Sequence, residues 1–92
     1  MADVVTVLSA TATIDTGIGQ LAGIVITASA GVPLATFYNN TSAAGVKIFE
    51  AYVPSTAPLV IFFSDRFAPR YTIGLHLVLA ANLTATVWTR QL

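Results

Sequence analysis

Seven stretches of the sequence alternate between two sets of side chains with a period of two residues. This is the period of a β-strand, because successive side chains of a strand point to opposite faces of its sheet. In the first stretch, Val5 and Val7 alternate with Thr6 and Leu8, and both sets are rich in β-branched residues, which favour strands. Turn-forming residues separate most stretches, and no stretch has a helical period. The predicted strands cover residues 5–14, 20–30, 34–39, 46–53, 59–64, 71–80 and 83–90.

Strands joined by short turns predict an all-β fold, an antiparallel β-sandwich of about seven strands with a jelly-roll-like arrangement. The chain has 92 residues, which is enough for one such domain over residues 1–92 and too few for a second core. Gly17 and Gly19 supply the first turn. Pro54 and Pro58 bracket a later connection, since a proline cannot donate a hydrogen bond to a central strand. No internal repeat is evident.

The composition is unusually apolar for a small domain. Hydrophobic residues make up 55% of the sequence and charged residues 9%, whereas a soluble domain usually has about 25% charged residues. A sandwich needs one apolar face on each strand, yet the first, second, fifth and sixth predicted strands are apolar on both faces. We therefore expect the second faces to be buried against other copies of the chain or against other proteins.

Several classes of function lack their usual sequence features. The formal net charge is zero, which removes the electrostatic basis for binding nucleic acid. Two long uncharged stretches, residues 16–46 and 71–89, are interrupted by turn-forming or polar residues, so no membrane-spanning helix is expected. Cysteine is absent, and no basic segment precedes an apolar one near the first residue. Neither disulfide bonds nor a secretory signal are therefore expected.

The titratable residues form no recognisable catalytic or metal-binding motif. His76 lies between two leucines, where we expect a sheet-face histidine that is hydrogen-bonded to a neighbour. The turn at residues 15–19 explains the presence of Asp15, and the arginines beside Asp65 explain the presence of that carboxylate. An offset of three places Lys47 and Glu50 on opposite faces of a strand, so we do not expect them to pair. The sequence predicts a protein that is not an enzyme and that holds neither a cofactor nor a metal.

The stretch FYNNTSAAGVKIF, residues 37–49, sets polar and small residues between two strands that carry aromatic side chains. Asn39 and Asn40 each begin a glycosylation sequon, but without secretion they are better explained as turn residues. A hairpin explains the stretch best, because Asn and Gly readily adopt the conformations of tight turns. We expect Gly45 to take one of these turn conformations.

The segment from Asp65 to Tyr71 breaks the alternation and contains two of the four basic residues. Arg66 and Arg70 bracket Phe67, and this mixture of aromatic and guanidinium groups is favoured at protein interfaces. An equally simple interpretation is a long loop whose arginines are solvated or paired with Asp65. Trp88 and Arg90 near the last residue are of the same types. The predicted interface residues are Arg66, Phe67, Arg70, Tyr71, Trp88 and Arg90.

The succession TATIDTGIGQLAGIVI, residues 11–26, followed by LATFYNNTSAAGVKI, residues 34–48, resembles small all-β virion proteins of tailed bacteriophages. Their pattern is a strand, a turn with Gly, a strand with Gly in its middle, and a turn of the form aromatic-Tyr-Asp/Asn-Asn-x-Ala/Ser-x-x-Gly. The resemblance covers most of the chain and ends in a similar Thr- and Val-rich strand. The loop from Asp65 to Tyr71 departs from the pattern, because it is longer and richer in arginine.

The resemblance implies a noncatalytic structural protein of a phage particle, of the head decoration or cement type. Such proteins bind the outer surface of the major capsid protein lattice as small oligomers, often trimers, and stabilise it against the pressure of the packaged genome. The expected partners are therefore other copies of the chain, with a trimer favoured, and the major capsid protein. The expected location is the virion, after synthesis in the host cytoplasm. The alternative is a tail-associated carbohydrate-binding or host-recognition β-sandwich, for which Tyr38, Asn39 and Asn40 come closest to a sugar-binding rim.

Overall fold

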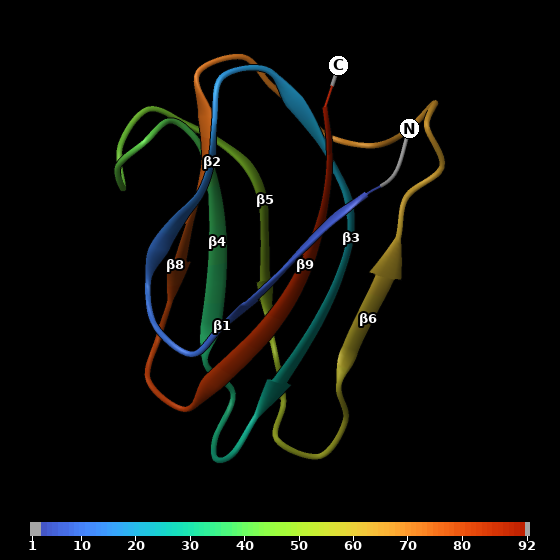
Figure 1. The fold of residues 1–92 in the computed structure, drawn as a ribbon. Coiled ribbons are helices and arrows are strands. Elements are labelled where there is room, and N and C mark those ends of the chain that lie inside the picture. Colours follow the sequence, from blue (N-terminus) through green and yellow to red (C-terminus); the bar gives the residue numbers. More distant parts are fainter. Residues whose placement is uncertain (1–2, 92) are drawn as a thin grey trace.

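The computed structural model describes residues 3–91, and within this range it consists of strands joined by turns and loops (Figure 1). The all-β fold class predicted from the sequence is confirmed. None of these residues lies in a helix long and apolar enough to cross a membrane. The strands are β1 (Val4–Leu8), β2 (Ala12–Thr16), β3 (Gly19–Ala28), β4 (Leu34–Asn39), β5 (Val46–Tyr52), β6 (Leu59–Phe62), β7 (Arg70–Tyr71), β8 (Gly74–Leu79) and β9 (Leu83–Gln91).

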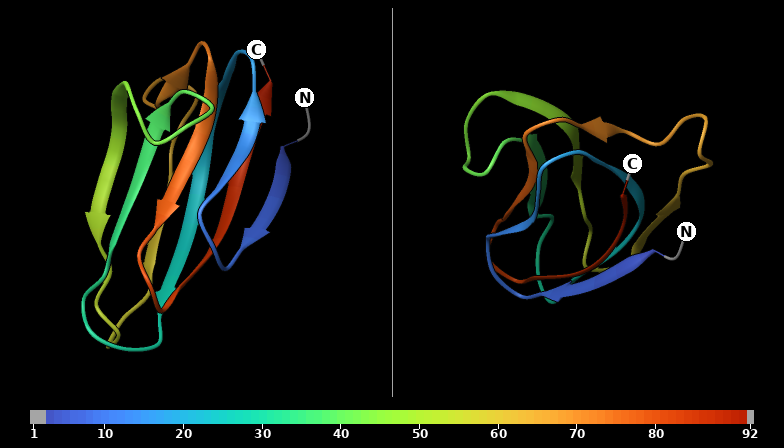
Figure 2. Two further views of the ribbon diagram at one scale, coloured as in Figure 1. Left: turned by 90° about the vertical axis from the view of Figure 1, so that its left-hand side faces the viewer. Right: turned by 45° about the horizontal axis from the view of Figure 1, so that its top comes forward.

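The strands form two antiparallel sheets that pack face to face (Figure 2). Sheet A has the order β1-β9-β3-β6, with the two-residue β7 also paired to β3, and sheet B has the order β2-β8-β4-β5. Among the eight longer strands, β4 and β5 are the one consecutive pair that stays in the same sheet. The first strand pairs with the last and the second with β8. This connectivity is that of a jelly roll, in which eight strands form two packed sheets.

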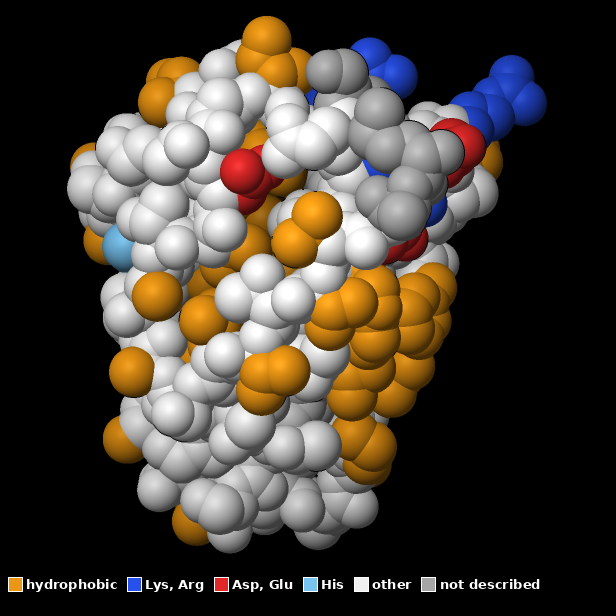
Figure 3. All heavy atoms as spheres, in the orientation of Figure 1, with side chains coloured by type: hydrophobic (Ala, Val, Ile, Leu, Met, Phe, Trp, Pro, Cys, Tyr) orange, Lys and Arg blue, Asp and Glu red, His pale blue; other side chains and the backbone are white. Residues whose placement is uncertain are grey.

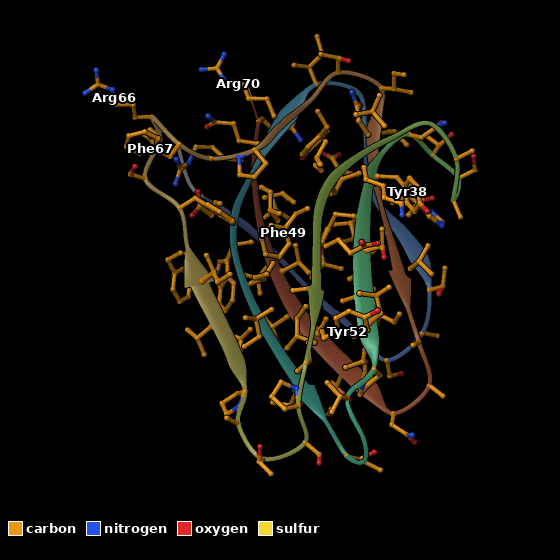
Figure 4. The ribbon with its side chains drawn as sticks, turned by 180° about the vertical axis from the view of Figure 1, so that it is seen from behind. Tyr38, Phe49, Tyr52, Arg66, Phe67 and Arg70 are labelled. Carbon is orange, nitrogen blue, oxygen red and sulfur yellow. The ribbon has the colours of Figure 1, made fainter. Side chains whose placement is uncertain are left out.

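The core lies between the sheets and consists of the inward-pointing side chains of both. One side of the sandwich, between β5 and β6, is closed by aromatic rings. Phe49 of β5, which Figure 4 labels, lies 6.1 Å from Phe37 and 6.0 Å from Phe63, measured between ring centroids. Burial of each such side chain stabilises the fold by about 1.5–3 kcal/mol. The largest fully buried residues are Leu21, Ile24, Ile26, Phe37, Val53, Tyr71, Leu75, Leu77 and Val87.

Strands β4 and β5 form the hairpin that was predicted in residues 37–49. The side-chain nitrogen of Asn40 donates to the carbonyl oxygen of Ala44 at 3.0 Å, and its side-chain oxygen accepts from the Thr41 amide at 2.7 Å. Gly45 has a φ of 87°, which a residue with a Cβ rarely adopts. Asn40 and Gly45 therefore act as turn residues, as the sequence predicts, whereas Asn39, also predicted to be a turn residue, is the last residue of β4.

A β-bulge in β5 changes which side chains share a face. Phe37 pairs with Phe49 but Tyr38 pairs with Lys47, so Ile48 is an extra residue in the ladder. The Nζ atom of Lys47 lies 3.2 Å from a carboxylate oxygen of Glu50. The prediction that Lys47 and Glu50 lie on opposite faces was therefore wrong, because it assumed an unbroken strand.

The predicted first strand, residues 5–14, is in fact two strands. β1 belongs to sheet A and β2 to sheet B, and bends at Ser9 and Ala10 carry the chain from one sheet to the other. Neither residue is a strong turn former, and the alternation continues through them, so the pattern gives no sign of the break. The six other predicted strands match β3, β4, β5, β6, β8 and β9, and β7 falls at the end of the predicted loop.

Candidate interaction surface

The outward surface of sheet A, called face A below, is an uncharged and largely apolar surface across four strands. The register aligns its side chains in two rows, one through Trp88 and one through Val25. Phe62 is 61% exposed and Val7 68% exposed, so large apolar groups lie in water. Figure 3 shows hydrophobic side chains gathered on the side of the molecule where β6 lies. The residues of face A are Val5, Val7, Gly23, Val25, Val60, Phe62, Thr86 and Trp88.

An aromatic pair occupies the centre of face A. The rings of Phe62 and Trp88 have centroids 5.1 Å apart and planes tilted by 58°, within the usual geometry of favourable aromatic contacts. Gly23 lies between them in the sheet, paired with Trp88 on one side and Phe62 on the other. A Cβ at residue 23 would overlap the Phe62 ring. The glycine in the middle of β3 therefore lets Phe62 lie across the sheet and reach Trp88.

An ion-paired cluster fixes one end of face A. The guanidinium of Arg90 lies 2.9 Å from an oxygen of Asp3, and its Nη1 pairs with Asp65 in the loop after β6. The side-chain nitrogen of Gln20 donates to the carbonyl oxygen of Asp65 at 3.0 Å. The hydrogen bonds from Arg90 to Asp3 are charge-assisted, and such bonds are stronger than neutral ones. The cluster therefore ties the loop of residues 63–69 to β3 and β9, beside face A.

The loop of residues 63–69 and the first residue of β7 present three of the predicted interface residues with their side chains in solvent. Arg66 and Arg70 are exposed and extend away from the rest of the molecule (Figure 4). Phe67, between them, is 75% exposed. Asp65 pairs with the distant Arg90, so the expectation that the arginines beside Asp65 explain this carboxylate was wrong. The structure thus ties the loop to Arg90 at one end of face A, two residues along β9 from Trp88.

Tyr71 differs from the other predicted interface residues, because its side chain is completely buried. Its hydroxyl donates to the Oδ2 atom of Asp15 at 2.6 Å. Burial, and then the hydrogen bond to Asp15, raise the pKa of the Tyr71 hydroxyl. Gln91 donates to the same carboxylate oxygen at 3.1 Å, so the cluster joins β2 of sheet B to β7 and β9 of sheet A. Tyr71 is therefore a core residue between the sheets and presents no surface to a partner in this conformation.

The outward surface of sheet B, called face B below, is more polar than face A, although it also carries Leu34, Tyr52 and Val78, and its polar groups are bonded to one another. Thr13 and His76 are joined by a hydrogen bond of 2.9 Å, as predicted for a sheet-face histidine. Thr36 donates to Glu50 at 3.0 Å, and Lys47 contacts the same carboxylate oxygen. The Thr36 hydrogen bond, and then that from Lys47, lower the pKa of the Glu50 carboxyl. The polar groups of face B are thus largely satisfied within the chain.

The region considered for a sugar-binding rim lies at one end of face B. Tyr38 is partly exposed there (Figure 4). The side-chain oxygen of Asn39 accepts from the backbone amides of Thr72 and Ile73, at 2.9 and 3.0 Å. The amide group of Asn40 is used within its own turn. Both asparagines are therefore engaged in holding the backbone.

The part of the chain from residue 3 to residue 91 encloses no detectable pocket and no group of three or more metal-ligating side chains. No family model matches the sequence, and the comparisons with characterised proteins and with solved structures found no match.

Five residues of face A, namely Val5, Val7, Val25, Val60 and Phe62, were not singled out from the sequence. The signal that could have found them is the apolar character of both faces of the first, second and fifth predicted strands.

Proposed function

We propose that this protein is a noncatalytic structural protein of a bacteriophage particle, which binds the outer surface of the capsid as an oligomer and stabilises it. Face A is the observation that carries the proposal. A soluble monomer rarely leaves a continuous apolar surface in water, and its burial against a partner is favourable by about 25 cal/mol per Å². Face A has aromatic residues at its centre and no charge, which is the composition of the buried part of an interface.

The loop beside face A supports a contact with a second protein. Arg66, Phe67 and Arg70 are exposed at the rim of the apolar surface. Charged groups at a rim mainly accelerate association and favour the correct partner, whereas the apolar centre supplies affinity. When many copies bind a repeating lattice, their individually modest contacts would together give stable binding.

The jelly roll is compatible with this proposal and with its alternative, because the fold occurs in both viral capsid proteins and lectins. The fold therefore does not decide between them. The alternative, a tail-associated carbohydrate-binding protein, would use exposed aromatic and amide groups. Asn39 and Asn40 are hydrogen-bonded within the chain, so no observation favours that alternative over binding through face A.

Co-sedimentation with empty heads of the encoding phage tests the proposal. Phe62→Asp places a charge at the centre of face A, and we expect it to weaken binding by about 30-fold or more, as for an interface hot spot. Tyr52→Asp is the matched control, because the two aromatic side chains are similarly exposed, at 66% for Tyr52 and 61% for Phe62. Tyr52 lies on face B, away from the proposed contact. The control should bind heads like the wild type.

Two outcomes would contradict the proposal. One is a wild-type protein that stays monomeric in light scattering and does not sediment with heads. The other is retention on a glycan array without binding to particles, which would favour the carbohydrate-binding alternative.

A further inference from the structure

The two sheets have four edge strands, β1 and β6 in sheet A and β2 and β5 in sheet B. One side of each edge strand carries backbone N–H and C=O groups that no neighbouring strand pairs. Such an edge can bind a strand of another chain, and most proteins prevent this with short strands, charges, prolines or bulges.

Three of the edge strands have features of this protective kind. β5 carries Lys47 and Glu50 and contains a bulge. β2 carries Asp15 and also has a register shift. β6 has only four residues and follows Pro58. Each of these edges is therefore poorly suited to pairing with another strand.

β1 carries no charge, proline or bulge. Its sequence, VVTVL, contains no charge, proline or glycine, and its register with β9 is unbroken over all five residues. Val4, Val5 and Val7 are each more than half exposed. In Figure 2, left, β1 lies at the outer edge of the molecule beside β9, and among residues 3–91 no strand pairs with its other side. β1 is thus an apolar and open edge.

We propose that β1 pairs antiparallel with β1 of a second copy of this chain, across a two-fold axis that passes through Thr6. When the two-fold axis passes through a residue of the strand, each odd-numbered residue lies opposite an odd-numbered residue of the partner. Paired side chains therefore point to the same face of the joined sheet. Val5 would then lie opposite the partner's Val7, and Thr6 opposite the partner's Thr6. Cross-strand pairs of β-branched residues and of threonines are favourable in antiparallel sheets.

The charges near β1 permit this pairing. Asp3 is the charged residue next to the strand, and it is paired with Arg90 of its own chain at 2.9 Å. Two copies would therefore bring no unpaired like charges together, which would be destabilising in directly opposite positions. Pairing at β1 would also place the two copies of face A side by side, because Val5 and Val7 belong to that face.

The length of β1 sets the expected strength of the contact. Five residues span about 17 Å, at about 3.4 Å per residue. A contact of one strand edge is smaller than the standard interface of about 800 Å² per partner, so we expect a dimer that dissociates on dilution. A two-fold contact also predicts even-numbered assemblies, in contrast to the trimers of the phage proteins that the sequence resembles. The inference does not depend on capsid binding.

Analytical ultracentrifugation of the free protein over a range of concentrations tests the pairing. Val7→Lys on β1 and Val60→Lys on β6 both add one lysine to face A at exposed positions, of 68% and 54% exposure, at opposite edges of sheet A. We expect the wild type and Val60→Lys to dimerise alike, and Val7→Lys to raise the dissociation constant by about tenfold or more. Equal weakening by both lysines would indicate stacking of face A on face A and would overturn the proposal. A wild-type protein that is monomeric up to about 1 mM, or trimeric, would also overturn it.

Cysteine cross-linking gives a second measurement, since the chain contains no cysteine. With the axis at Thr6, the double variant Val5→Cys/Val7→Cys should form disulfide-linked dimers on mild oxidation, and neither single variant should. Absence of the cross-link in a folded double variant would overturn the proposal. Heads are absent from both experiments, so failure here is distinguishable from failure of the capsid-binding proposal.

Discussion

Face A and face B are the outward surfaces of the two sheets of the same jelly roll, yet they differ in polarity. On face B, Thr13 bonds to His76, and Thr36 and Lys47 both bond to Glu50. On face A, Phe62 and Trp88 contact each other, and the rest of the surface offers apolar area to water. Polar groups that are bonded within the chain gain little from a partner, whereas exposed apolar area gains stabilisation when it is covered. The comparison therefore directs the search for partners to face A.

The largest effect is expected at the link that holds the two sheets together. Tyr71→Phe removes the hydroxyl that donates to Asp15, and should lower the free energy of unfolding by about 1.5–3 kcal/mol, as for a hydrogen bond to a charged group. Urea denaturation measures this loss. Tyr52→Phe is the control, because Tyr52 is exposed on face B and its hydroxyl should contribute less than about 0.5 kcal/mol. Equal effects of the two substitutions would show that Tyr71 does not join the sheets.

The same hydroxyl predicts a pH dependence. The pKa of Tyr71 is raised in the folded protein above its ordinary value of 10.0. Its contribution to stability is therefore fully present below a pH of about 10, and it is lost as the pH rises from there towards the folded pKa. The difference in stability between the wild type and Tyr71→Phe should shrink over this alkaline range. A difference that stays constant would contradict the raised pKa.

A smaller effect is expected on face A. Gly23→Ala forces the Phe62 ring away from its place over β3, and should lower the free energy of unfolding by about 1 kcal/mol, since an exposed ring can move. Thermal or urea unfolding measures the change. In a Phe62→Ala background the same substitution should cost clearly less. If it costs as much, the overlap with Phe62 is not the reason for glycine at this position.

The smallest effect is expected on face B. Thr36→Val removes the hydrogen bond that contributes most to lowering the Glu50 pKa, so this pKa should rise towards its ordinary value of 4.5. NMR titration of the Glu50 carboxyl measures the change. Because the folded pKa is lowered, the stabilisation is present above the unfolded pKa and is lost as the pH falls through the folded pKa. Lys47→Gln should raise the pKa less, and a reversed order would show that Lys47 is the main partner of Glu50.

The fold class was predictable from the sequence, because a period of two and turn-forming residues together identify strands. The division of residues 5–14 into β1 and β2 was not, because the chain changes sheets while its alternation continues. The pairing of Lys47 with Glu50 depends on a bulge, which a count of alternate positions cannot reveal. Only the strand order could show that Val5, Phe62 and Trp88 lie in one row, since that row joins strands distant in sequence. Residue type suggested an interface role for Tyr71, whereas burial between the sheets depends on the tertiary fold.

The position of β9 between β1 and β3 has a consequence for biosynthesis. During translation, β1 and β3 leave the ribosome before β9, the strand that separates them in sheet A. At about 5–20 residues per second, the valines of β1 stay without their neighbour for several seconds. Sheet A can therefore close only after residues 83–91 are complete. Ribosome stalling before these residues would leave an aggregation-prone strand exposed, so chaperone support during synthesis should raise the yield of folded protein.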